Sequence, residues 1–258
     1  MMTLFANAAL LILAFVSLLW LISIVLVNVS IIDIFWGFAY VLVNSSYFFQ
    51  LNEWHLRNIV LLVLVSLWGI RLSLHLAWRN GGKGEDFRYR EFRRKYGEQR
   101  YWWISFFQTF LLQGALVMLI SLPLLAAQYN TANSQLNGFD YLGIAFWLLG
   151  FVFESGSDLQ LAMFKRKPNN KGKLLTTGFW RYTRHPNYFG DAAVWWGFAF
   201  FSIAADAYWP IVGAVIMTWL LLKISGVALL EKTLVSTKPG YREYMEKTSA
   251  FIPWFPKK

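Results

Sequence analysis

The chain has 258 residues, of which 57% are hydrophobic and 19% aromatic, and only 15% are charged. This composition excludes an ordinary soluble domain and indicates an integral membrane protein. Because the sequence has no cysteine, disulfides, thiolate nucleophiles and cysteine metal sites are excluded, and the three histidines are too scattered to suggest a metal or haem site. The net charge of +10 would suggest nucleic acid for a soluble protein, but membrane topology accounts for it here, so no nucleic-acid partner is expected.

Apolar stretches long enough to cross a bilayer, about 20 residues each, follow one another along the chain. We expect seven transmembrane helices, near residues 4–27, 31–50, 58–78, 103–126, 139–163, 188–205 and 208–230. The first stretch lacks the basic start of a signal peptide and is interpreted as a retained span. The predicted fold class is therefore all-α: a polytopic membrane protein whose residues 1–258 form a single membrane domain.

The basic residues predict how these helices are oriented. The segments 79–101, 165–187 and 231–258 hold eight, seven and six Lys plus Arg, which is 21 of the 24 in the chain. Because positive residues beside membrane spans remain on the cytoplasmic side, we expect the N-terminus outside and the C-terminus in the cytoplasm. The segment 79–101 also mixes glycines with charges, and it could form either a cytoplasmic lid over a cofactor or a contact with lipid headgroups.

Polar residues inside spans are costly and usually face a cavity or one another. Eight of them fall at the cytoplasmic half of the predicted spans: Asp33, Arg71, His75, Glu154, Asp158, Asp191, Lys223 and Glu231. A structural salt bridge is the alternative for any one of them, but their common depth favours a polar cofactor cavity. By contrast, Glu53, Asp140 and Asp206 fall at external ends, where we expect a carboxylate to be solvated.

The segment 178–191, GFWRYTRHPNYFGD, places cations, aromatic rings and hydrogen-bonding side chains at the start of an apolar helix. Pro186 suits the first turn of a helix, where its missing N–H is not needed. Asn187 and Asp191 then share one helix face. A helix N-terminus presents free N–H groups and a partial positive charge, so the segment predicts an anionic cofactor, whereas a loop that only fixes topology is the simpler interpretation.

Residues 181–191, together with Ser157 and Asp158 upstream and the tail 241–253 downstream, resemble the membrane steroid 5α-reductase family (3-oxo-5α-steroid 4-dehydrogenases), in particular its bacterial branch. The resemblance covers residues 139–258 and is weak before them. It implies an enzyme of the bacterial inner membrane that takes NADPH from the cytoplasm and passes hydride to the C=C bond of a 3-oxo-Δ4 steroid. Helices within about 4–126 would form the substrate cavity, and those within about 139–258 would bind the cofactor.

The resemblance also implies which residues bind the cofactor. Asp158 is similar to the family's cofactor-binding Asp, Glu154 stands where the family has Asn, and Asn187 with Asp191 matches its Asn-x-x-x-Glu pair. The cofactor-binding set expected on these grounds is Glu154, Asp158, Lys165, Arg181, Tyr182, Arg184, His185, Asn187, Asp191, Lys223, Glu231 and Tyr244.

For catalysis, the resemblance places Asp33 at the family's ketone-polarising Glu, Trp68 at its Tyr, and His75 where a second Tyr stands. Reduction of an enone needs hydride at the β carbon and a hydrogen-bond donor for the oxygen that becomes an enolate. Burial can hold a carboxyl group such as that of Asp33 protonated. The expected partners are a steroid or other flat lipid that enters from the bilayer and the membrane lipids, and the protein is expected to be a monomer.

Two other functions stay open. The residues Arg184, His185, Pro186 and Tyr188 also resemble the Arg-His-Pro-x-Tyr signature of isoprenylcysteine carboxyl methyltransferases, which use S-adenosylmethionine. Those enzymes tend to carry paired glutamates in the last helix, whereas this chain has only Glu231 there. The cations of the segment 165–187 also suit the 2′-phosphate of NADPH better than a sulfonium cofactor. The third possibility, a non-catalytic sterol or lipid binder, leaves the polar cluster unexplained.

Overall fold

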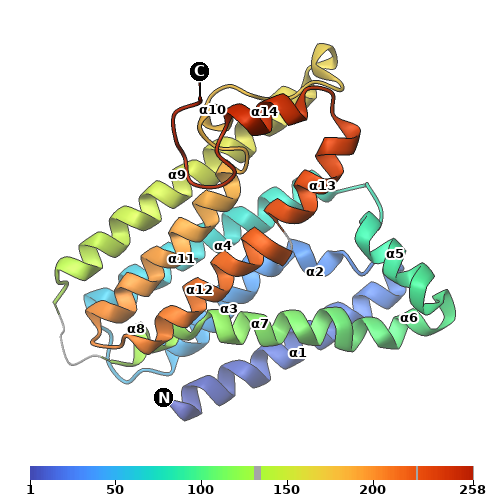
Figure 1. The fold of residues 1–258 in the computed structure, drawn as a ribbon. Coiled ribbons are helices and arrows are strands. Elements are labelled where there is room, and N and C mark those ends of the chain that lie inside the picture. The colour runs from blue at the N-terminus through green and yellow to red at the C-terminus, as the bar shows by residue number, and fades with distance from the viewer. Residues whose placement is uncertain (131–134, 225, 258) are drawn as a thin grey trace. The chain divides into compact units, whose positions relative to one another are not determined.

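The computed structural model describes residues 1–130, 135–224 and 226–257, and within these ranges the chain is helical with no strand (Figure 1). It divides into two compact units, residues 1–136 with 205–207 and residues 137–204 with 208–258. The first unit contains α1 (Met2–Leu26), α2 (Ile31–Ile34), α3 (Trp36–Phe49), α4 (Leu56–Asn80), α5 (Phe87–Tyr96), α6 (Glu98–Ser105), the π-helical turn η1 (Phe106–Leu111), α7 (Leu112–Ile120) and α8 (Leu122–Tyr129).

The second unit begins with the longest helix and ends with a short one near the C-terminus. Its elements are α9 (Gly138–Arg166), η2 (Pro168–Asn170), α10 (Phe179–Tyr182), α11 (Pro186–Ala204), η3 (Trp209–Ile211), α12 (Val212–Trp219), the π-helical turn η4 (Leu220–Ile224), α13 (Val227–Thr237) and α14 (Tyr241–Lys247). The predicted helix start at Pro186 is confirmed.

Four helices in the described part of the chain are long and apolar enough to cross a membrane: Met2–Leu26, Leu56–Asn80, Glu98–Ile120 and Gly138–Arg166. Each overlaps a predicted span, so within the described residues the all-helical fold class is confirmed and the apolar helices indicate a membrane protein. Three predicted spans, 31–50, 188–205 and 208–230, correspond to helices outside this group, and 31–50 is divided into α2 and α3. The predicted span 103–126 extends beyond Glu98–Ile120 but is interrupted at Ser121, where Pro123 in the first turn of α8 has no N–H to continue the hydrogen-bonded ladder of α7.

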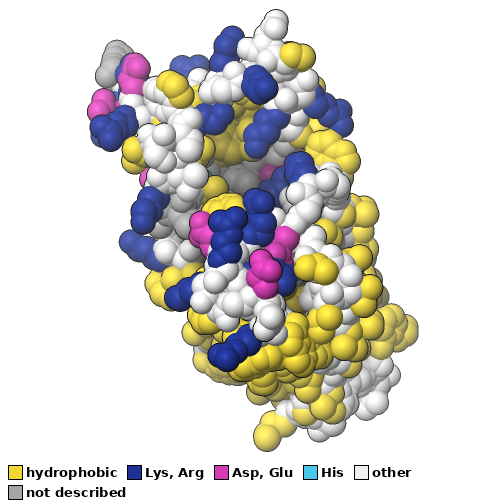
Figure 2. Space-filling view, turned by 90° about the vertical axis from the view of Figure 1, so that its right-hand side faces the viewer, with side chains coloured by type: hydrophobic (Ala, Val, Ile, Leu, Met, Phe, Trp, Pro, Cys, Tyr) yellow, Lys and Arg dark blue, Asp and Glu magenta, His cyan; other side chains and the backbone are white. Residues whose placement is uncertain are grey.

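The surface has both the apolar areas and the charged areas that a membrane protein requires. Large aliphatic side chains on α1 remain open to the surroundings, with Leu10 66% and Val25 83% exposed. Figure 2 shows broad hydrophobic areas on the face that it draws, with Lys and Arg gathered away from them. Exposed apolar surface of this extent would be unfavourable in water, but lipid tails cover it without penalty.

Glycines bring the backbones of two helices into contact in each unit. In the first unit, a Cβ atom on Gly37 of α3 would lie 3.1 Å from the Cα atom of Gly69 on α4. In the second, a Cβ atom on Gly190 of α11 would lie 2.6 Å from the carbonyl oxygen of Gly150 on α9. Small residues permit such close packing between membrane helices, and α9 and α11 consequently run side by side (Figure 1).

The expectation of a solvated Asp140 is wrong. Its side chain is fully buried in the first turn of α9, where it accepts a hydrogen bond from the backbone N–H of Asn137 at 2.8 Å. The side chain of Asn137 in turn accepts from the N–H groups of Phe139 and Asp140. This reciprocal capping satisfies helix-terminal donors, so the carboxylate has a structural use at that end of the helix.

We expect Gly190→Ala to destabilise the protein, because its new methyl group would overlap the backbone of α9 at Glu154 and Gly150. Overpacking of this kind costs about 1–3 kcal/mol, which a lowered melting temperature of the detergent-solubilised protein would report. Gly138→Ala is the matched control, because nothing lies within 4 Å of a Cβ atom at that position. Equal melting temperatures for the two variants would contradict the tight α9–α11 contact.

Candidate functional site

Four predicted cofactor residues meet where α9 packs on α11. Asn187 on α11 donates a hydrogen bond from Nδ2 to Oδ1 of Asp158 on α9, at 3.3 Å. Asp158, Glu154 and Asp191 are buried, with 7%, 3% and 9% exposure, and Gly190 lies against the backbone N–H of Glu154. We call Glu154, Asp158, Asn187 and Asp191 the α9–α11 polar cluster. The helix contact and the predicted helical spacing explain why Asp158 meets Asn187 and why Glu154 and Asp191 lie one turn away along the same two helices.

Arg184 forms the centre of a second group in the same unit. Its Nε and one terminal nitrogen each lie 2.7 Å from Oε1 of Glu231 on α13, and its other terminal nitrogen donates to the carbonyl oxygens of Met245, at 3.0 Å, and Thr248. The guanidinium group is 8% exposed. All three of its nitrogens thus contact acceptors within the protein itself, so Arg184 is engaged in holding this unit together.

His185 joins the same glutamate. Its Nε2 lies 3.2 Å from Oε1 of Glu231, and its ring stacks on that of Tyr188, with the centroids 5.7 Å apart. Burial lowers the pKa of His185 below its ordinary value, against the opposing effect of Glu231. The imidazole is therefore neutral at pH 7, and we assign its proton to Nε2, which donates to the carboxylate.

The tail after α14 runs along the segment that contains Arg184. Three hydrogen bonds of 2.9 Å join the two segments: from the N–H of Arg184 to the oxygen of Ser249, from Oγ1 of Thr183 to the oxygen of Phe251, and from the N–H of Trp254 to the oxygen of Tyr182. The hydroxyl of Tyr244 donates to the carbonyl oxygen of Trp180, and burial raises the pKa of this phenol. Tyr244 and the tail therefore fix the backbone of the segment 180–184.

The other predicted cofactor residues of this unit are on the surface. Lys165 in the last turn of α9, Arg181 in α10 and Lys223 in η4 are exposed. The ring of Tyr182 is 37% exposed and meets that of Phe255 edge to face, with the centroids 6.0 Å apart. These side chains are exposed, in contrast to that of Arg184.

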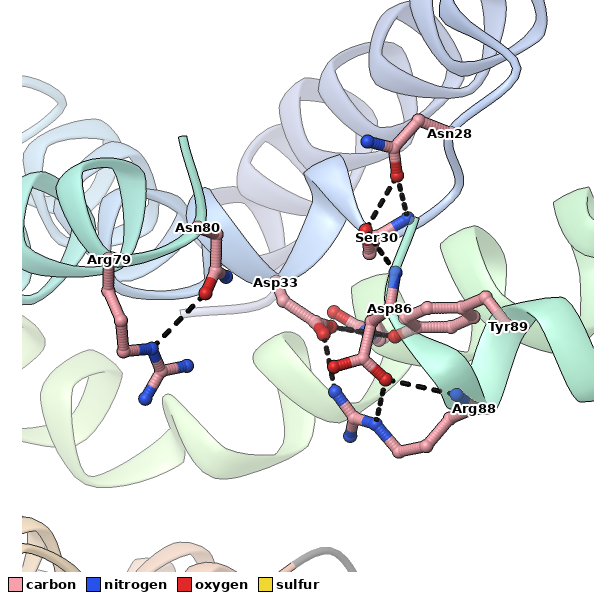
Figure 3. Close-up of polar contacts among 9 residues, drawn as sticks. Asn28, Ser30, Asp33, Arg79, Asn80, Asp86, Arg88 and Tyr89 are labelled. Atoms are coloured by element: carbon pink, nitrogen blue, oxygen red, sulfur yellow. Dashed lines mark hydrogen bonds and ion pairs between the residues drawn. The ribbon is translucent and has the colours of Figure 1, made fainter. Parts of the chain in front are cut away.

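The first unit holds a separate polar group around Asp33 (Figure 3). Oδ1 of Asp33 accepts from the hydroxyl of Tyr89 at 2.7 Å and from Nε2 of Gln113 at 3.2 Å, and Oδ2 forms an ion pair with Arg88 at 2.8 Å. Arg88 also contacts Asp86, at 2.9 Å. We call Asp33, Asp86, Arg88, Tyr89 and Gln113 the Asp33 cluster. Burial and the charge of Asp33 raise the pKa of Tyr89 well above its ordinary value, so its phenol keeps its proton.

The residues predicted to assist Asp33, Trp68 and His75, are both on α4. Trp68 is fully buried and packs against Tyr40, with ring centroids 5.8 Å apart, and His75 is half-buried with its ring 5.9 Å from that of Trp78. The hydrogen-bond partners of Asp33 come instead from α5 and α7. The sequence contains one indication that a helix begins beside Arg88 and Tyr89. Asp86 is a favourable capping residue, and its side chain caps α5 by accepting a hydrogen bond from the N–H of Arg88.

The helical architecture and the apolar spans define the class of the chain, an integral membrane protein. Residues 19–248 match the family described as "Protein of unknown function (DUF1295)", and since the match covers most of the chain, the chain belongs to that family. It is also 25% identical over 266 residues to "Uncharacterized protein C594.04c" of Schizosaccharomyces pombe, which covers 92% of this chain and 76% of the relative. Neither description includes an activity.

We expect Arg184→Gln to release the tail, because it removes the ion pair with Glu231 and weakens the bonds to Met245 and Thr248. Breaking one partner of a mostly buried pair costs on the order of 3–5 kcal/mol. Limited proteolysis should then cleave within residues 241–257 much faster than in the unchanged protein. Lys247→Gln, which breaks only the exposed pair with Glu243, is the control and should leave the rate unchanged. Equal cleavage of both variants would refute the role of Arg184.

Proposed function

We propose that the protein is an NADPH-dependent reductase of a C=C bond conjugated to a ketone in a steroid-like, flat lipid. In this proposal seven helices span the bacterial inner membrane, the N-terminus is outside, and the cofactor site faces the cytoplasm. The observation that carries the proposal is the α9–α11 polar cluster, in which Asn187 and Asp191 follow the helix start at Pro186 and the buried Glu154 and Asp158 come from the facing helix α9. The resemblance of residues 139–258 to steroid 5α-reductases supplies the reaction.

The residues of this unit fit the cofactor in part. Carboxylates are good acceptors for ribose hydroxyl groups, and the 3.3 Å contact between Asp158 and Asn187 is long enough for such hydroxyls to replace it favourably. The exposed Arg181 and Lys165 would hold the phosphates, while Arg184 would position their backbone segment rather than bind them. NADPH, when bound, supplies the hydride.

The Asp33 cluster would stabilise the negative charge that develops on the ketone oxygen of the substrate. Hydride addition at the β carbon leaves negative charge on the ketone oxygen, which needs a donor already in place. Tyr89 is protonated and donates its one O–H to Asp33, so this hydrogen would have to turn from the carboxylate to the ketone oxygen, while Arg88 balances the charge of the carboxylate. Tyr89 would thus supply the phenol that is missing at Trp68, and Asp33 would act as its positioning residue.

A membrane methyltransferase that uses S-adenosylmethionine is the second candidate, and one observation favours it. Arg184 and His185 both contact Glu231, and His185 stacks on Tyr188. The residues of the Arg-His-Pro-x-Tyr signature are thus joined to Glu231 of α13, as is expected of residues that hold a cofactor together.

Thermal stability in detergent separates the two functions, because a ligand that binds only the folded state stabilises it by about 2.7 kcal/mol at 100 times its Kd. We expect NADPH to raise the melting temperature more than NADH, and S-adenosylmethionine to have no effect. Asp158→Ala and Asn187→Ala should abolish the NADPH shift, whereas Glu53→Gln, at an exposed acid of the other unit, should keep it. A shift with S-adenosylmethionine alone would establish the methyltransferase instead.

Tyr89→Phe tests the donor. Removal of one hydrogen-bond donor to a developing oxyanion typically lowers kcat by about 100- to 1000-fold, so reduction of a 3-oxo-Δ4 steroid should fall by that factor while the NADPH-induced thermal shift is kept. Tyr96→Phe is the control, because that phenol lies exposed at the end of α5. A fully active Tyr89→Phe enzyme would exclude the phenol as the donor.

A further inference from the structure

The cations of α5 divide between two faces of the helix. Arg88 and Arg93 turn inward, Arg88 to Asp33 and Asp86, and Arg93 to Glu85 with contacts of 2.8 and 3.0 Å. Glu85 also accepts from the backbone N–H of Val29 at 2.9 Å, so it joins α5 to the chain just before α2. These ion pairs fasten α5 to the first unit at two points and argue against a freely opening lid.

The exposed side of α5 carries three further cations: Arg90 and Arg94 on the side away from Arg88, and Lys95 at the edge, two turns after Arg88. All three are exposed, and within the described part of the chain none of them forms an ion pair. Lys95 contacts only the ring of Tyr96, at 5.4 Å from its centroid. Glu91 is the single acid in the sequence of α5, so this face, which we call the α5 outer face, has a net positive charge.

The position of α5 in the chain decides what lies opposite this face. Residues 81–97 connect α4 with the helix Glu98–Ile120, and both are long and apolar enough to cross a membrane. Exposed tryptophans mark the connected ends of these helices, with Trp78 54%, Trp102 50% and Trp103 46% exposed. Tryptophan is enriched at the level of the lipid headgroups. A connector of this length therefore holds α5 close to the headgroup region.

We propose that the α5 outer face binds the headgroups of anionic phospholipids. Arg90 and Arg94 lie one turn apart, and guanidinium groups suit the oxygens of a phosphodiester. The partly exposed rings of Phe87, Phe92 and Tyr96, at 46%, 36% and 38%, suit the boundary between headgroups and acyl chains. Cations beside membrane spans are attracted to anionic lipids in this way. The proposal does not depend on the reductase function.

The test measures lipid binding to the full chain in neutral detergent by native mass spectrometry, with phosphatidylglycerol and phosphatidylcholine as the probes. Each cation near an anionic headgroup contributes a factor of roughly five to the affinity, so three of them give on the order of 100-fold. We expect the unchanged protein to prefer phosphatidylglycerol by a large factor. The triple variant Arg90→Gln, Arg94→Gln and Lys95→Gln should lose most of that preference.

Two controls distinguish lipid binding by the α5 outer face from a general effect of positive charge. Lys171→Gln, Lys173→Gln and Lys257→Gln together remove the same charge from exposed positions of the other unit and should keep the preference. Arg90→Lys with Arg94→Lys retains the charge and should also keep it. If the two triple variants lose the preference equally, or if the α5 variant binds like the unchanged protein, the proposal fails.

A salt titration of the unchanged protein tests the proposal without any variant, in case the α5 triple variant does not fold. Attraction between exposed charges is screened over about 3 Å at 1 M salt and about 10 Å at 0.1 M. The preference for phosphatidylglycerol should therefore decline steeply between these concentrations. A preference that does not change with salt would overturn the electrostatic basis of the site.

Discussion

The close approach of α9 and α11 is the constraint on which the second unit depends. Because Gly150 and Gly190 have no side chains, the two backbones come within contact distance, and a polar cluster forms two turns further along α9. Without that approach Asp158 and Asn187 could not share a hydrogen bond. The same contact presses Gly190 against Glu154, so the buried acids cannot move apart without separating the helices.

Buried charge imposes the second constraint. Burial of an isolated ion is costly, and in both units the structure offsets that cost with partners from distant parts of the sequence. Arg184 meets Glu231 across 47 positions, and Asp33 meets Arg88 across 55. One pair fastens α13 to the segment before α11, and the other fastens α5 to α2, so these polar groups hold each unit together.

Features that depend on helical periodicity and on the length of apolar runs could be predicted from the sequence. Features that depend on contacts between distant segments could not. Four spans and the grouping of Asp158 with Asn187 follow from runs of apolar residues and helical spacing. The partners of Asp33 could not be predicted, because α5 contacts α2 only after the chain has turned through the glycine-containing connector. The involvement of Arg184 with Met245 and Thr248 depends on backbone carbonyl groups, which leave no signature in the sequence. Asp140 was misjudged because a capping residue and a solvated one look alike.

The bonds of Arg184 also have an order in time. During synthesis this residue emerges 47 positions before Glu231 and 64 before Thr248, so its guanidinium group is still hydrated when α11 has already been made. Once the last part of the chain is made, the same group changes its hydration water for carbonyl and carboxylate oxygens. The contacts that hold the segment before α11 to α13 and to the tail can therefore form only after the whole chain has been synthesised.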